Sequence, residues 1–117
     1  MALQISEKQI SGVTVLDFEG RITLGDESNQ VRTRIKEMLG KGKSQIVLDL
    51  AGVSYIDSAG LGMLMAGYAS ARNQGATLKL ANLTKKFSEL LNITKLVTIF
   101  DTYDSFDVAV KSFAAKA

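Results

Sequence analysis

Two kinds of apolar spacing alternate along this chain, and the alternation limits its fold more than any other feature. Runs typical of strands cover residues 3–10, 13–18, 45–50, 76–82 and 96–100. Apolar residues recur at helical spacing within 26–40, 61–75, 84–91 and 104–113. The order is therefore two strands followed by alternating helices and strands. It predicts a single α/β domain over residues 1–117, in which right-handed crossovers place helices against a largely parallel sheet.

Turn and capping residues support these boundaries. Ser11-Gly12 offers a tight hairpin turn between the first two strands. Asp26 can cap the start of the first helix, Gly40 can end it, and Asp104 can open the last one. The nearly continuous run IVLDL at 46–50 is typical of a parallel strand that other elements cover.

Composition excludes several classes of function. The chain has 14 basic and 12 acidic residues, and a net charge of +2 is too small to indicate nucleic-acid binding. It contains no cysteine, so a disulfide framework is impossible and a reducing compartment is favoured. It also contains no histidine, the commonest general base and metal ligand. We therefore expect no enzymatic activity, no metal and no cofactor.

Membrane and export signals are also missing from the sequence. No apolar stretch reaches the roughly 18 residues that a membrane-spanning helix requires. Residues 1–10 lack the basic and apolar blocks of a signal peptide. We expect a cytoplasmic protein without membrane insertion.

Three short patterns resemble catalytic or nucleotide-binding motifs, but each lacks a required residue. Ser58 lies where a nucleophile elbow would place its serine, yet Ile56 replaces the necessary glycine and the triad histidine does not exist. The GKS tripeptide at 42–44 leads into a strand, and Glu37 stands where a phosphate-binding loop begins with glycine. The GLG tripeptide at 60–62 lacks the third glycine of a dinucleotide fingerprint.

The segment YIDSAGLG at 55–62 is the most informative stretch for function. Asp57 and Ser58 are both favoured N-cap residues, so the pair before a helix often indicates capping alone. One cap is sufficient, however, which leaves one of the two side chains unexplained. The following residues are small or apolar and would let a second protein approach the hydroxyl: Ala59, Gly60, Leu61 and Gly62.

A helix start is also a suitable place for a phosphoserine at position 58. Phosphate would add about −1.5 to −2 charges, which the unpaired N–H groups of the first turn and the positive end of the helix dipole would stabilise. Asp57 would repel the new dianion. Phosphorylation would therefore change the surface field more than the backbone.

Residues 46–82, which contain the DSAGLG motif after a buried strand, resemble the STAS domains of bacterial anti-sigma-factor antagonists, sulfate-transporter tails and stressosome proteins. The opening hairpin, the FEGRITL segment at 18–24 and the final helix follow the same order, so the resemblance covers essentially the whole chain. It implies a four- to five-stranded mixed sheet with helices packed mainly on one face.

The resemblance also implies a phospho-switch. In antagonists of this type, the serine that matches Ser58 is phosphorylated by a partner that is both anti-sigma factor and ATP-dependent serine kinase, and a PP2C-like phosphatase reverses the modification. The unphosphorylated form binds the kinase and frees the sigma factor. Ser58 would be the acceptor, and Asp57 would contribute to docking. Gly60 and Gly62 would admit the partner, while Asp26 would shape the docking surface.

Two non-catalytic alternatives follow from the same resemblance. Small STAS subunits occur in ABC transporter complexes that move lipids, where the domain is a structural partner of the ATPase. Stressosome scaffolds use the domain in a further assembly. The transporter role would leave the Ser58 hydroxyl unmodified or make its modification secondary.

Overall fold

The computed structural model describes residues 3–23, 25–93 and 100–114. It confirms the predicted α/β class and the order of the elements. The strands are β1 (Gln4–Ile10), β2 (Val13–Ile22), β3 (Gln45–Ile56), β4 (Thr77–Ala81) and β5 (Thr102–Tyr103). The helices are α1 (Asp26–Gly40), α2 (Ser58–Asn73), α3 (Lys85–Ile93) and α4 (Phe106–Ala114).

The five strands form one mixed sheet in the order β1-β2-β3-β4-β5. β1 and β2 pair antiparallel, and every later neighbouring pair is parallel. The hairpin turn consists of Ser11 and Gly12, whose φ angles of 52° and 81° match the type I′ turn that suits the twist of a hairpin. This confirms the turn predicted at these two residues.

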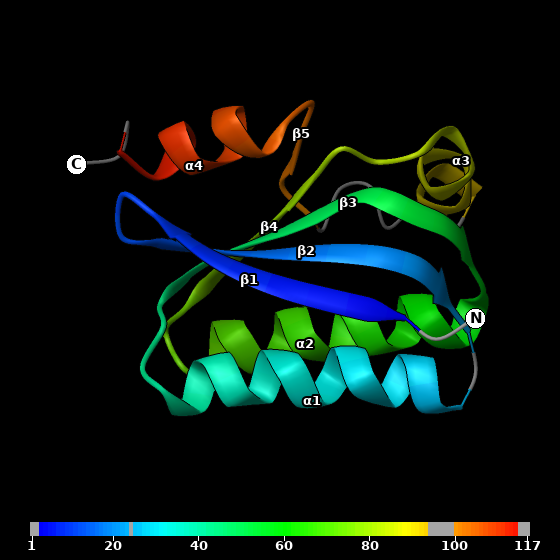
Figure 1. Cartoon of the computed structure of the whole chain (residues 1–117), viewed down its shortest axis with the longest axis horizontal. Helices are drawn as coiled ribbons and strands as arrows, with labels where there is room; N and C mark the ends of the chain where they lie inside the picture. Colours follow the sequence, from blue (N-terminus) through cyan, green and yellow to red (C-terminus); the bar gives the residue numbers. More distant parts are fainter. Residues whose placement is uncertain (1–2, 24, 94–99, 115–117) are drawn as a thin grey trace.

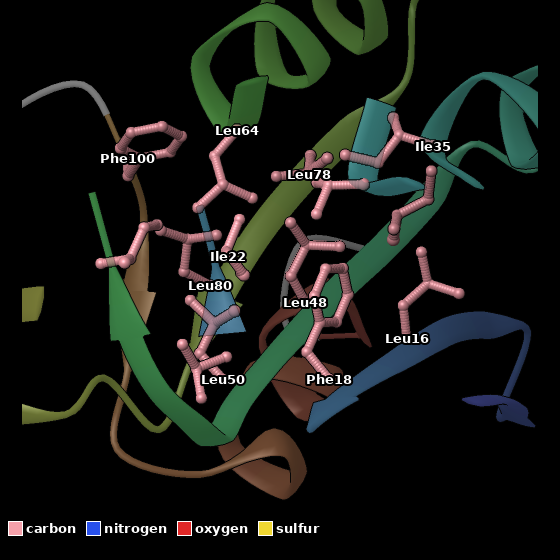
Figure 2. Close-up of a cluster of buried hydrophobic side chains, with 14 of the residues drawn as sticks. Leu16, Phe18, Ile22, Ile35, Leu48, Leu50, Leu64, Leu78, Leu80 and Phe100 are labelled. Atoms are coloured by element: carbon pink, nitrogen blue, oxygen red, sulfur yellow. The ribbon is translucent and has the colours of Figure 1, made fainter. Parts of the chain in front are cut away.

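Helices cover the sheet unequally (Figure 1). α1 and α2 lie side by side on one face, α4 lies on the opposite face, and α3 lies near the end of β3. The main core fills the space between the sheet and α1 with α2, and α3 adds Phe87 and Leu91 to it. Figure 2 shows strand and helix side chains of this core converging, among them Leu16, Phe18, Ile22, Ile35, Leu48, Leu50, Leu64, Leu78, Leu80 and Phe100.

β3 is the central strand that its apolar run predicted. Ile46 and Leu48 point into the main core, whereas Val47 joins a second cluster under α4. The second cluster also contains Val13, Val15, Ala81, Ala109, Val110 and Phe113. Because both faces are covered, consecutive apolar residues of β3 are all buried.

A buried lysine fastens α4 to the second face. Lys79 of β4 is fully buried, and its Nζ donates a hydrogen bond of 2.6 Å to the Oγ of Ser112. The amine also lies 4.2 Å from the ring centre of Phe113, a geometry that favours a cation–π contact. Ser112 in turn donates to the carbonyl of Ala109 at 2.6 Å.

Two predicted boundaries change. The N-cap of α1 is Gly25, with φ 109°, and Asp26 is instead the first helical residue. Ser105, not Asp104, accepts the bond from Val108 N–H at 3.3 Å that caps α4. The strand predicted at 96–100 lies outside the described residues except for its last position, and the fifth strand is the two-residue β5.

No helix in the described part of the chain is both long enough and apolar enough to cross a bilayer.

Candidate functional site

Asp57 is the N-cap of α2. Its backbone is extended, with φ −103° and ψ −179°, and its Oδ1 accepts a hydrogen bond of 2.8 Å from the N–H of Gly60. Its carbonyl accepts from the N–H of Leu61 at 3.0 Å, the first bond of the helix. The side chain that satisfies the helix start is therefore the aspartate, and the ambiguity between Asp57 and Ser58 is resolved.

Ser58 is the first residue of the helix and is exposed. Its hydroxyl makes no hydrogen bond to any other residue within 3–23, 25–93 and 100–114. Since Asp57 already acts as the cap, capping does not explain this serine. Its oxygen is open to a second molecule at the end of the helix where the backbone N–H groups point outward.

Gly60 is buried because α2 begins directly against the end of β2. A Cβ at this position would collide with the carbonyl oxygen of Ile22 and lie 2.8 Å from its Cγ2. The same carbonyl accepts a bond of 3.2 Å from the N–H of Asp57. The missing side chain of Gly60 thus makes room inside the protein, and whether a partner also touches Gly60 stays a prediction.

Gly62 differs from Gly60 in its surroundings. It is exposed, and a Cβ built on it would meet no atom within 4 Å. Gly62 follows Ser58 by one helical turn and therefore lies on the same face. Around the hydroxyl, Ala59 is half-buried and Leu61 belongs to the core. Ser58 and Gly62 therefore present only a small side chain and a bare backbone along this face.

The start of α1 lies at the same end of the molecule as the start of α2 (Figure 1). Asp26 is the first residue of α1, and its side chain lies outside the described atoms. The structure therefore brings the backbone of this predicted residue to the Ser58 end of the fold. Its contribution to docking stays a prediction.

Two residues of this end were missed by the sequence reasoning. The guanidinium carbon of Arg21 lies 5.0 Å from the ring centre of Tyr55, and the tyrosine is 42% exposed. The signal available in the sequence was the spacing of Val53 and Ile56, which both point into the core although they are three positions apart. Strict strand alternation cannot give that pattern.

Acidic residues elsewhere in the described ranges form a pair across two strands. Asp17 and Asp49 are paired across β2 and β3. Burial, together with the charge of Asp49, raises the pKa of the Asp17 carboxyl. Asp49 accepts hydrogen bonds from Ala51 N–H at 3.1 Å and from the Asn82 amide at 2.9 Å. Within the described ranges, no three acidic residues are grouped so that they could hold a metal ion.

One hollow among the described residues lies away from Ser58. It encloses about 440 Å³ beside β5 and the start of α3. Its lining includes Asn82, Thr84, Ser88 and Tyr103. Ser58 instead lies on an open surface, which suits contact with a protein better than enclosure of a small molecule.

Comparisons with known proteins point to one family. The family model described as "Mlab, STAS domain" matches residues 6–100. The anti-sigma F factor antagonist of Paenibacillus polymyxa is 26% identical over 106 residues, which cover 90% of this chain and 90% of the relative.

Solved structures show the same fold. The crystal structure of an anti-sigma factor antagonist from Mycobacterium paratuberculosis has a TM-score of 0.81 at 19% identity, covering 95% of this chain and 93% of that one. The Bacillus cell fate determinant SpoIIAA, solved in its phosphorylated form, has a TM-score of 0.73 at 14% identity, covering 94% and 99%. At these identities, the likenesses establish a shared architecture.

Proposed function

The chain belongs to the STAS-domain family, and from this premise we propose that it is an anti-sigma-factor antagonist controlled by phosphorylation of Ser58. One observation carries the proposal: Asp57 caps α2, and the Ser58 hydroxyl beside it is exposed. In the unphosphorylated state, the protein binds a kinase-type anti-sigma factor and thereby releases the sigma factor.

The chemistry of the switch follows from the position of the serine. The bound kinase transfers the terminal phosphoryl group of ATP to the Ser58 oxygen. The P–O bond between the β- and γ-phosphates of ATP breaks, and ADP leaves. The hydroxyl proton passes to the kinase or to water. The product carries about −1.5 to −2 charges at the positive end of a helix dipole. The first turn of α2 contains no acidic residue of its own, and the Asp57 cap beside it opposes this charge.

The same charge acts against the complex. A partner that packs closely over Ser58 and Gly62 excludes water there, and burying a dianion without a matched cation is costly. The phosphorylated protein therefore keeps its fold and loses its partner. A PP2C-like phosphatase that removes the group restores binding.

The protein itself contributes no catalysis in this proposal and acts in the cytoplasm. Support comes from the absence of histidine and cysteine in the chain and from the naming of its relative as an antagonist. Hydrolysis of an ester or nucleotide by the purified protein would contradict this part.

Phosphorylation is tested with intact-mass measurement. The chain is incubated with ATP and, in turn, each purified kinase-type anti-sigma factor of the source genome. We expect a gain of one phosphate in the wild type and in Ser6→Ala, which alters an exposed serine on β1, and none in Ser58→Ala. A phosphate that persists in Ser58→Ala would refute the assigned acceptor.

Binding separates the switch from a scaffold role. Ser58→Ala should bind the kinase about as tightly as the wild type, and Ser58→Asp should bind more weakly. A structural subunit of a lipid-moving ABC transporter would instead bind its ATPase equally well with either substitution. That outcome would favour the alternative.

A further inference from the structure

A one-residue bulge in β3 gives the Ser58 end of the sheet an unusual surface. Gly20 pairs with Val53, but the next residue, Arg21, pairs with Tyr55. Ser54 is the extra residue, and its Oγ donates to the carbonyl of Gly20 at 3.3 Å. Bulges re-aim side chains and are over-represented beside functional sites. Here the bulge places Tyr55 directly across from Arg21.

The two side chains form a preordered pair on the outside of the protein. Tyr55 is 42% exposed, although large apolar side chains of this chain are mostly buried. The Arg21 guanidinium lies over its ring at 5.0 Å, which favours a cation–π contact and restrains both side chains. Tyrosine and arginine held in this way lose little conformational entropy when another protein covers them.

The pair lies at the same end of the sheet as Ser58, on the face opposite the one where Ile22 and Ile56 enter the core. Ile22, which follows Arg21, accepts the bond from Asp57 N–H and lies against Gly60. Tyr55 precedes Asp57 by two residues in the chain. The pair therefore lies next to the backbone that supports the first turn of α2.

The chemistry of Arg21 indicates what should cover it. No carboxylate within the described ranges forms an ion pair with Arg21, so the face of its guanidinium contacts Tyr55 while its N–H groups stay available. A guanidinium with free N–H groups is suited to bidentate binding of a carboxylate.

We propose that Arg21 and Tyr55 anchor the kinase-type anti-sigma factor, which supplies a carboxylate to Arg21 and an apolar pocket to Tyr55. This inference rests on the proposed function and extends its interface from the helix start across the end of the sheet. Interface energy concentrates in a few residues, among which tyrosine and arginine are enriched. The pair would contribute to affinity, whereas the phosphorylation state of Ser58 would decide whether the complex forms.

Calorimetry measures how tightly purified kinase-type anti-sigma factors from the source genome bind the wild-type protein and its variants. We expect Tyr55→Ala and Arg21→Ala each to weaken binding by about tenfold or more, and Tyr55→Phe to weaken it little, since the ring is kept. Val108→Ala is the matched control, because Val108 is 49% exposed on α4 and should bind like the wild type.

A charge reversal at Arg21 tests whether the partner supplies a carboxylate. Arg21→Glu should weaken binding more than Arg21→Ala, because it sets a carboxylate against a carboxylate. The effects of Arg21→Ala and Tyr55→Ala should not add in the double variant if the two residues act as one unit. Thermal unfolding of each variant should stay close to that of the wild type.

The outcomes are distinguishable. If Ser58→Asp weakens binding while Tyr55→Ala and Arg21→Ala match the wild type, the anchor is refuted and the proposed function stands. If the anchor variants bind more weakly only because they unfold at lower temperature, the pair is structural and the inference is equally refuted. If no anti-sigma factor binds the wild-type chain, both proposals fall.

Discussion

The carboxylate of Asp57 and the backbone N–H of Gly60 are joined by a hydrogen bond of 2.8 Å, and this bond separates the roles of two adjacent side chains. Asp57 stabilises the helix, whereas Ser58 has no part in that task. The two residues can therefore be altered independently, which makes the proposed switch open to direct tests.

Removing the cap should lower stability, whereas removing the hydroxyl should not. We expect Asp57→Ala to reduce the free energy of unfolding by about 0.5–2 kcal/mol, since the N–H of Gly60 loses its acceptor, and Asp57→Asn to retain most of it. Ser58→Ala should stay within about 0.5 kcal/mol of the wild type. Urea denaturation measures all three. Equal losses in Asp57→Ala and Ser58→Ala would mean that the hydroxyl shares the capping role.

The two glycines of α2 should respond oppositely to the same substitution. Gly60→Ala places a methyl group against the Ile22 backbone and should cost about 1–3 kcal/mol. Gly62→Ala meets open space and should stabilise the helix by up to about 1 kcal/mol. If the kinase packs over this face, Gly62→Ala should nevertheless weaken its binding. Unchanged kinase affinity would place Gly62 outside the interface.

The buried amine of Lys79 should make the fold sensitive to Ser112. Ser112→Ala leaves that amine without its acceptor and should cost about 1–3 kcal/mol. In a Lys79→Met background, the same change should have a much smaller effect, because the amine is absent. Chemical denaturation of the four proteins of this cycle gives the coupling. Identical costs in both backgrounds would show that the 2.6 Å contact adds nothing to stability.

Because the pKa of Asp17 is raised, we expect that neutralising its side chain increases stability by an amount that depends on pH. Burial and the neighbouring Asp49 favour the protonated carboxyl in the folded state. The stabilisation from this group is thus complete below its unfolded-state pKa and is lost as pH rises through the higher folded-state value. Asp17→Asn should therefore raise stability at pH 7 more than at pH 4.

A charge-matched control accompanies the Asp17 measurement. Glu89→Gln removes one negative charge from an exposed position of α3 and accounts for the change in net charge. Urea midpoints at both pH values decide the result. A gain from Asp17→Asn that is no larger at pH 7 than at pH 4 would contradict the predicted direction.

Apolar spacing was sufficient to predict the order of the elements but not their details. Val47 and Leu48 are buried on opposite faces of the sheet, which is why β3 could be recognised from its continuous run. β5 has only two residues, too few for any periodic pattern, so this strand could not be recognised from apolar spacing. Asp26 has the chemistry of a cap, yet the left-handed backbone of Gly25 takes that position.

The candidate site could likewise be predicted only in part from the sequence. The DSAGLG pattern located the helix start, but Asp57 and Ser58 have nearly equal capping preferences, and only the geometry distinguishes them. The contact between Arg21 and Tyr55 depends on a register shift of one residue. The bulge behind this register shows in the sequence only as the spacing of Val53 and Ile56, so the contact itself could not be predicted from sequence alone.

The strands lie across the sheet in the same order in which they occur along the chain. Synthesis delivers the N-terminal segments first, so each newly emerged strand can join an edge that is already complete. The hairpin, β3 and α2, and with them Ser58, are all encoded before β4 begins at Thr77. The growing polypeptide can thus begin to assemble the Ser58 end of the fold before the residues that close the far side of the sheet have left the ribosome.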